Sequence, residues 1–246
     1  MNWLDLAVAS PSIGIQCEPR LQFPHEMLDA LKPTLAKWKA ARGDLIFHVP
    51  SVASLIQIKP GDGFICDVLG NGLTTTFAYQ SKVVDKPASL PTITNPSVQR
   101  FSDLLSRAIE LSSAICERLS DPPVVLTRLG IVADCRIDEK AMPPGVTRFL
   151  EHVGKPWQSR PVILSGVTTV DLPSDDRWTY RCHHAIDINS VDRPEDVRVK
   201  LDWQMFPKGD PRPIARGNAQ QLISEAAARA NKYFERFGGG GLAYGA

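Results

Sequence analysis

The chain has 246 residues, of which 43% are hydrophobic and 22% are charged. These proportions are ordinary for a globular protein and argue against global disorder. Its 28 basic residues are balanced by 27 acidic ones, for a net charge of +1, which argues against a dominant phosphate-binding role because nucleic-acid affinity depends on clustered positive charge.

The N-terminal ten residues lack the basic region and the sustained apolar run of a secretory signal. No stretch approaches the roughly 18 apolar residues that a membrane-spanning helix needs. We therefore expect a cytoplasmic protein with no membrane partner. Five widely spaced cysteines, none in a Cys-x-x-Cys pair, favour reduced, buried thiols over disulfides or zinc ligands. They are Cys17, Cys66, Cys116, Cys135 and Cys182.

The first half of the chain predicts a strand, a helix and then a meander of short strands. Alternating apolar residues indicate a strand over 12–23, with a bend at Pro19, and helical spacing indicates a helix over 25–42. Four strands follow, over 45–49, 54–59, 64–69 and 73–80. The glycine-rich segments 60–63 and 70–72 supply hairpin turns, because Gly and Asn accept a positive φ.

Residues 83–96 contain three prolines and indicate a connector. The helix after it is expected to be capped by Asn95, to begin at Pro96 and to end near residue 119. One face of this helix is apolar and consists of Val98, Phe101, Leu104, Leu105, Ala108, Leu111, Ile115 and Leu119. The helix is therefore suited to cover one side of the preceding meander.

The second half repeats this order of elements. Its expected elements are a strand over 124–137, a helix over 144–153, strands over 162–170, 178–188 and 197–206, and a helix over 218–237. We therefore expect an α+β fold of two similar halves, 1–121 and 122–237, each a strand, a helix, an antiparallel meander and a long covering helix. An internal duplication is a hypothesis from this order alone.

The halves are expected to lie side by side or to fuse into one sheet, and a single helix-grip barrel around one cavity is the alternative assembly. The tail over 238–246 begins with four glycines, Gly238 to Gly241, and is expected to be flexible.

Several short segments carry a resemblance to a known group of proteins. They are the N-terminal strand leading to Pro24, Leu-Ile-Gln-Ile at 55–58, Phe-Ile-Cys-Asp at 64–67, Thr-Arg-Leu-Gly-Ile at 127–131, Ala-Ile-Asp-Ile at 185–188 and the helical end at 230–237. In this order they resemble a sporadically distributed family of uncharacterised bacterial proteins of similar length. The resemblance covers most of the chain. It implies an α+β fold, a bacterial origin and an accessory function in a mobile or defence-linked operon, but no activity.

The predicted strand over 178–188 holds the best candidates for chemistry. Because successive side chains of a strand point to opposite faces, His183 and His184 cannot close on one metal ion. His183 shares its face with Arg181 and Asp187, which suggests a general base oriented by a carboxylate; a solvated polar face explains the same pattern. His184 lies on the apolar face and fits a hydrogen-bonded core imidazole better than a metal ligand.

Carboxylates also gather near the end of the strand over 124–137. Asp134 and Asp138 share a face with Arg128 and Arg136, so a nuclease metal site and a ladder of ion pairs are both consistent with the spacing. No glycine-rich loop joins a strand to a helix in a phosphate-binding pattern, and no Gly-x-Ser-x-Gly segment is present.

The strand over 197–206 alternates apolar residues with polar ones. Its polar face, formed by Arg198, Lys200, Asp202 and Gln204, is the candidate contact surface, since extended sheets are good docking platforms. We therefore expect a protein without catalytic activity or cofactor that binds a macromolecule, either another protein or a second copy of itself, through this surface or the tail. Two alternatives stay open: a helix-grip module that binds a small ligand, with weak hydrolytic activity, and a metal-dependent nuclease.

Overall fold

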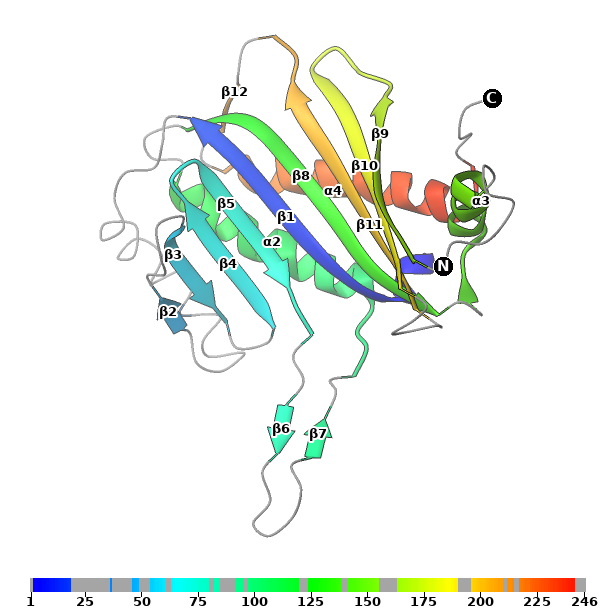
Figure 1. The fold of residues 1–246 in the computed structure, drawn as a ribbon. Helices are drawn as coiled ribbons and strands as arrows, with labels where there is room; N and C mark the ends of the chain where they lie inside the picture. Colours follow the sequence, from blue (N-terminus) through cyan, green and yellow to red (C-terminus); the bar gives the residue numbers. More distant parts are fainter. Residues whose placement is uncertain are drawn as a thin grey trace.

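The computed structural model describes residues 2–18, 36, 46–48, 54–60, 63–79, 82–84, 92–94, 97–119, 124–138, 141–154, 163–189, 196–209, 212–214 and 217–241. They form a large antiparallel sheet with helices on it, as expected for an α+β fold (Figure 1). The sheet contains β1 (Val8–Glu18), β2 (Ile46–His48), β3 (Ser54–Lys59), β4 (Phe64–Leu69), β5 (Gly72–Phe77), β8 (Val124–Asp138), β9 (Ile163–Leu172), β10 (Trp178–Asn189), β11 (Asp196–Pro207) and β12 (Arg212–Ile214). The helices are the 3-10 helix η1 (Trp3–Asp5) and α2 (Phe101–Leu119), α3 (Pro144–Gly154) and α4 (Ala219–Gly238).

The strands of both halves join in one sheet. Its order is β2-β3-β4-β5-β1-β8-β11-β10-β9, and β12 adds to β8. β1 and β8 pair antiparallel at the centre, with Gly14 opposite Gly130, and the last strand of each meander lies beside the first strand of its own half. The halves are therefore fused through β1 and β8. The described strands form an open path from β2 to β9 and do not close into a barrel.

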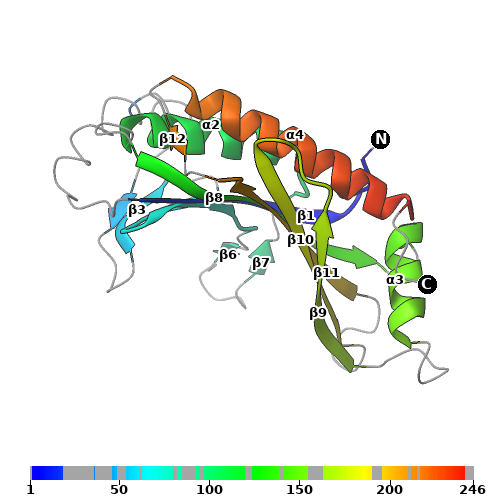
Figure 2. The same cartoon turned by 90° about the horizontal axis from the view of Figure 1, so that it is seen from above.

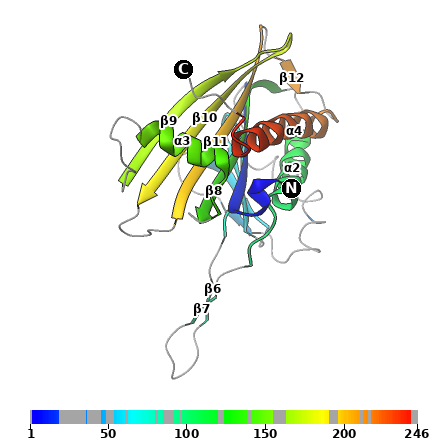
Figure 3. The ribbon, with the colours of Figure 1, turned by 90° about the vertical axis from the view of Figure 1, so that its right-hand side faces the viewer.

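Helices α2 and α4 lie together on one face of this sheet (Figure 2). α2 packs against β1 and β5, whereas α4 packs against β8, β11 and α2. The strand residues beneath them are apolar and buried, for example Ile13, Ile131 and Leu201, and each such side chain stabilises the fold by about 1.5–3 kcal/mol. α3 contacts α4 at the same end of the molecule as η1 (Figure 3). Of the helices described, none combines the length and apolar character needed to cross a membrane.

The start of α2 differs from the sequence prediction. The helix begins at Phe101 and not at Pro96, so the predicted cap at Asn95 is wrong. The side chain of Asp5, far away in sequence, takes that role: its Oδ1 accepts a hydrogen bond of 2.8 Å from the backbone N–H of Ser102. A carboxylate at this position satisfies a free N–H and favours the positive end of the helix dipole.

The connector predicted over 83–96 is not wholly irregular. It contains two short strands, β6 (Lys82–Val84) and β7 (Thr92–Thr94), that pair antiparallel with Val83 opposite Ile93. Their β-branched residues favour extended backbone, and the pair extends away from the large sheet (Figure 1). The helix predicted over 25–42 and the bend at Pro19 lie outside the described residues, apart from position 36, which is helical.

The turn between β4 and β5 forms at Gly70 and Asn71, as predicted. The adjacent Gly72 lies against β1 so closely that an added Cβ would stand 1.9 Å from the carbonyl oxygen of Ile15. Only glycine fits there without moving a central strand.

All five cysteines are buried free thiols, as the sequence predicted. Burial raises the pKa of Cys66 and of Cys116 to about 12. Such thiols are poor nucleophiles at neutral pH, because the thiolate is the reactive form.

Candidate interaction surface

The large sheet has a second face, opposite α2 and α4, that no described helix covers (Figure 2). We call it the open face. Its central residues come from four neighbouring strands, and the cross-strand register places them side by side. They are Ser10, Ser12 and Gly14 of β1, Gly130, Val132 and Asp134 of β8, Arg198, Lys200, Asp202 and Gln204 of β11, and Arg181, His183 and Asp187 of β10.

Two glycines form the middle of the open face. Gly14 lies directly opposite Gly130 across the two central strands. A Cβ added at Gly14 would meet no atom within 4 Å, and one added at Gly130 would lie 3.6 Å from Asp202 Oδ1. Beside them, the hydroxyls of Ser12 and Thr76 share a hydrogen bond of 3.1 Å. The face is therefore flat at Gly14, which is partly exposed and lets another chain approach the backbone there, whereas Gly130 is buried beside Asp202 and Gln204.

Charges of both signs surround this flat centre. Arg198 of β11 donates two hydrogen bonds, of 2.9 and 2.6 Å, to the carboxylate of Asp134 on β8, and this pairing raises the pKa of Arg198. Arg181 donates to Asp171 at 2.8 Å. The open face thus alternates in charge, which matches a partner with its own mixture of charges better than a polyanion.

The four β11 residues predicted as a contact surface all lie on the open face. Arg198 and Lys200 are exposed, Asp202 is half-buried, and Gln204 is only 7% exposed. The amide of Gln204 donates to Asp202 at 2.8 Å, next to Gly130. The first two side chains therefore stand out from the sheet, whereas the last two lie along it.

The predicted set of His183, Arg181 and Asp187 also shares the open face, but it forms separate pairs. His183 Nδ1 shares a hydrogen bond of 2.8 Å with Thr169 Oγ1 on β9. Asp187 lies in register between Arg198 of β11 and Ser165 of β9. The hydrogen bond of His183 is thus to a hydroxyl, and the arrangement is a polar ladder between neighbouring strands.

The carboxylates considered for a nuclease metal site lie on the same face. Asp134 is engaged by Arg198, and Arg136 stands between Asp134 and Asp138 along β8. Among the residues that the structure describes, no three His, Cys, Asp or Glu side chains come together as metal ligands would. This geometry is that of paired charges along neighbouring strands and not that of a nuclease metal site.

His184 lies on the other side of the sheet, under the helices. It is buried, and its Nε2 shares a hydrogen bond of 2.8 Å with the hydroxyl of Tyr233 on α4. Its ring packs beside Phe237, with centroids 5.0 Å apart, and against the edge of Phe149 on α3. Burial lowers the pKa of His184 to about 4, so the imidazole is neutral at physiological pH and ties β10 to the helices.

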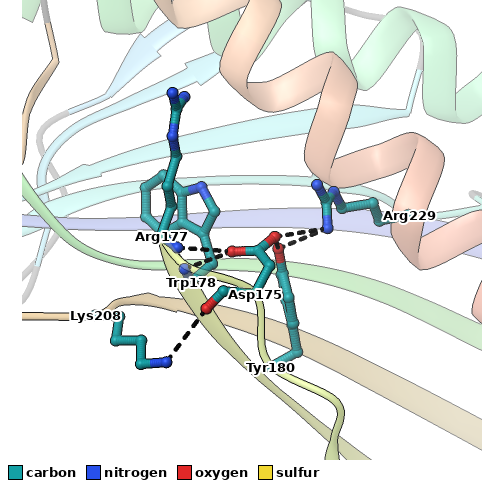
Figure 4. Close-up of polar contacts among 6 residues, drawn as sticks. All are labelled: Asp175, Arg177, Trp178, Tyr180, Lys208 and Arg229. Carbon is teal, nitrogen blue, oxygen red and sulfur yellow. Dashed lines mark hydrogen bonds and ion pairs between the residues drawn. The ribbon is translucent and has the colours of Figure 1, made fainter.

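A polar cluster at the turn between β9 and β10 was not predicted from the sequence. Asp175, in the turn, accepts hydrogen bonds on Oδ1 from the backbone N–H groups of Arg177 and Trp178, at 2.9 and 2.8 Å (Figure 4). Its Oδ2 accepts from the hydroxyl of Tyr180 at 2.5 Å and from Arg229 of α4 at 3.0 Å. We call Asp175, Tyr180 and Arg229 the turn lock, because together they fasten this hairpin to α4.

The electrostatics of the turn lock agree with its geometry. The hydrogen bond from Tyr180 lowers the pKa of Asp175 to about 2, while burial raises the pKa of Tyr180. The guanidinium of Arg229 donates to the Tyr180 hydroxyl at 2.7 Å and lies 5.3 Å from the centre of its ring. The sequence signal that could have predicted the turn is an Asp in a short segment between two strands. Its side chain readily accepts hydrogen bonds from the backbone N–H groups that follow it.

Two hollows lie at opposite ends of α4. One, of about 260 Å³, is bordered by Trp178, Ile214 and Leu222 near the start of the helix. The other, of about 510 Å³, is bordered by Trp3 and Met142 near its end. Neither runs between the sheet and the middle of the covering helices.

Comparison with known proteins finds no match for this chain among family models, curated proteins or solved structures. The resemblance suggested by the short motifs therefore stays a prediction, and the function has to be argued from the geometry of the chain itself.

Proposed function

We propose that this chain is a non-enzymatic binding protein whose open face docks another protein. The observation that carries the proposal is the one-sided cover of the sheet: helices bury one face, and the other presents a flat glycine centre with charges around it. A sheet that is packed on one side and open on the other is a rigid platform.

The size of the open face suits a protein partner. Strands in a sheet lie about 4.8 Å apart and rise about 3.3 Å per residue, so four strands of at least ten residues and one of six cover roughly 700 Å². That area is close to the roughly 800 Å² per partner buried in a standard protein interface. The strands β5, β1, β8, β11 and β10 provide it around Gly14 and Gly130.

The charge pattern favours a protein over a nucleic acid. Two arginines of the face are paired with carboxylates, Arg198 with Asp134 and Arg181 with Asp171. A nucleic-acid site would present a run of basic side chains along the phosphates. The same pairing weighs against the nuclease alternative, and we expect no nicking of DNA with added Mg²⁺ or Mn²⁺.

The small-ligand alternative receives less support. A helix-grip module needs an apolar cavity between its sheet and its long helix, whereas the two hollows described here lie at the ends of α4. The proposed site is the surface, and no cofactor is part of the proposal.

The duplicated organisation is part of the same proposal. The pairing order is similar on both sides of the central β1–β8 pair, with four meander strands outward from β1 (β5, β4, β3 and β2) and three outward from β8 (β11, β10 and β9). This order supports an origin of residues 1–121 and 122–237 from one ancestral unit, although residue-level similarity is weak. The tail over 238–246 is a second candidate contact; its start is held by a hydrogen bond from Arg148 to Gly240 O, and residues 242–246 lie outside the described range.

The test places a bulky side chain at the centre of the open face. Gly14→Phe adds a ring where space is open, and Gly70→Phe adds the same ring in open space at the β4–β5 turn. Tagged wild type and both variants are used to capture partners from a lysate of cells that make the protein, with and without nuclease, and thermal unfolding confirms that both variants are folded.

The proposal expects a stoichiometric protein partner that survives nuclease, binds the wild type and Gly70→Phe equally, and is lost with Gly14→Phe. A partner that Gly14→Phe still binds, or one released by nuclease, would overturn docking on this face. Turnover of a substrate that a single polar substitution abolishes would overturn the non-enzymatic assignment.

A further inference from the structure

Strand β9 ends the large sheet and has one neighbour among the described strands, β10. The backbone groups on its other side point away from the sheet. Edge strands of this kind are templates for pairing with another strand, and proteins usually block them with charged residues, proline, a bulge or a short length.

None of these blocking features occurs over residues 163–170 of this edge. β9 spans ten residues, from Ile163 to Leu172, and its first charged residue is Asp171. Its register with β10 is continuous, without a bulge. Residues 165–169 are all exposed, on both faces of the strand, and Val167 at their middle is 68% exposed.

The edge is also held in a fixed geometry. Thr169 is bonded to His183, and Asp171 is bonded to Arg181, both on β10. The turn lock fastens the next turn to α4. Because the strand is already ordered, pairing with another strand costs little further conformational entropy.

We propose that β9 is a dimerisation edge, which pairs antiparallel with β9 of a second copy of this chain around a two-fold axis at Val167. This interface is distinct from the proposed docking of another protein on the open face, so either can fail without the other. The sheets of the two copies would then continue through the axis as one sheet.

A second copy fits because Val167 is the middle of the exposed block and the block contains no charged residue. Antiparallel pairing on that axis places Val167 opposite the partner's Val167, Ser165 opposite Thr169, and Gly166 opposite Thr168. All these pairs are uncharged, so no like charges face each other, which would be destabilising. Asp171 falls opposite position 163 at the rim, well away from its counterpart in the second copy.

The first test is charge exchange at the axis, read as molecular mass by analytical ultracentrifugation over a concentration series of the full chain. Val167→Lys and Val167→Asp each place like charges opposite one another in the dimer. We expect each to raise the dimer dissociation constant at least tenfold, and an equimolar mixture of the two to restore the dimer. Val98→Lys is the matched control, since Val98 is 57% exposed on a different segment.

The second test is a single new thiol. Val167→Cys should form a disulfide-linked dimer on mild oxidation, because the Cα atoms of directly opposed residues lie about 4.5–5.5 Å apart, within the range that a disulfide spans. The five native cysteines are buried and do not compete. Val98→Cys should stay monomeric under the same treatment.

A wild type that stays monomeric at every soluble concentration would overturn the proposal, as would a dimer that Val167→Lys leaves unchanged. Capture of an extended segment of a different protein at β9, by a wild type that is itself monomeric, would assign the edge to that partner and overturn the second-copy assignment.

Discussion

The two meanders of the sheet occupy equivalent places and differ in how deeply they are buried. Counting outward from the central pair, β3 stands in the first half where β9 stands in the second. Ile56 and Ile58 of β3 are fully buried on the helix-covered side of the sheet. Gly166 and Thr168, on the same side of β9, are exposed, as is Val167 on the other side. The same position in the pairing order is therefore core in one half and open edge in the other.

The lengths of the strands and the reach of the covering helix explain this difference. The strands β3 to β5 have six residues each, whereas β9 to β11 have ten to twelve. α4 packs on β8 and β11, and its Tyr233 and Phe237 reach β10 at His184. Beyond β10, residues 165–169 are exposed. Pairing differs as well: β3 is paired on both sides, with β2 and β4, whereas β9 is paired only with β10 among the described strands.

The largest expected effect on stability comes from truncating a buried side chain of β3. Ile58→Ala removes a fully buried side chain from β3 and should lower the free energy of unfolding by about 2–5 kcal/mol, through lost burial and the cavity left behind. Urea unfolding followed by circular dichroism measures it. A loss below about 1 kcal/mol would show that β3 is no more a part of the core than β9.

The pH dependence of stability caused by His184 tests whether the core extends to β10 in the second half. Its pKa is lowered in the folded protein, to about 4, so the unfolded chain takes up its proton first as the pH falls below about 6.5. The full stability is present above that pH, and up to about 3 kcal/mol is lost between pH 6.5 and 4. Chemical unfolding at a series of pH values measures the slope.

The control for this pH dependence is His184→Phe, which keeps an aromatic ring beside Phe237 and cannot titrate. Its loss of stability between pH 6.5 and 4 should be smaller than that of the wild type. Parallel curves for the two proteins would contradict the burial of a neutral imidazole at this position. The stability contributed by Asp175, whose pKa is lowered to about 2, is present above about pH 4 and is lost only as the pH falls below that.

The turn lock tests how firmly the exposed edge is held. Asp175→Ala removes the acceptor of two backbone N–H groups, Tyr180 and Arg229, and we expect a loss of about 1–2 kcal/mol because the carboxylate is partly exposed. Hydrogen exchange of the β9 and β10 amides should become faster, while exchange in β4 and β5 stays unchanged. Asp176→Ala, at the exposed neighbouring residue, is the matched control and should match the wild type.

The smallest effect is expected on the exposed strand itself. Val167→Ala should change the stability of the monomer by less than about 0.5 kcal/mol, since surface substitutions rarely do more. The difference between the losses of unfolding free energy for Ile58→Ala and Val167→Ala measures how much more a side chain contributes in buried β3 than at the exposed edge of β9. Equal losses, measured by urea unfolding at a concentration where the chain is monomeric, would contradict it.

Much of the fold was predictable from local pattern. The alternation in β10 and β11 correctly separates buried from open residues, and the bounds of β3, β4 and α3 are within a residue of those predicted. What failed depends on distant contacts. The cap of α2 comes from Asp5, about a hundred positions earlier in the chain, and no local rule points to it.

The residues of the candidate interaction surface were likewise predictable only where local pattern decides their place. The shared face of Arg181, His183 and Asp187 follows from the two-residue period of a strand, but their partners follow from the register with β9 and β11. The turn lock needs Arg229 from α4 beside Asp175, a contact that sequence spacing cannot give. The exposure of β9 likewise depends on how far α4 reaches across the sheet.

The junction of β1 with β8 also shapes the order in which the chain folds. The first strand to be synthesised completes its pairing only with a strand that begins at Val124, and Asn2 and Trp3 bond to Asn231 and the carbonyl of Phe234 on α4. Contacts between such distant parts of a chain form slowly, because a long loop must close before any of them stabilises the fold. During synthesis the first half is therefore left with a central strand that is paired on one side only, with β5. We expect folding to reach completion only after α4 has been released.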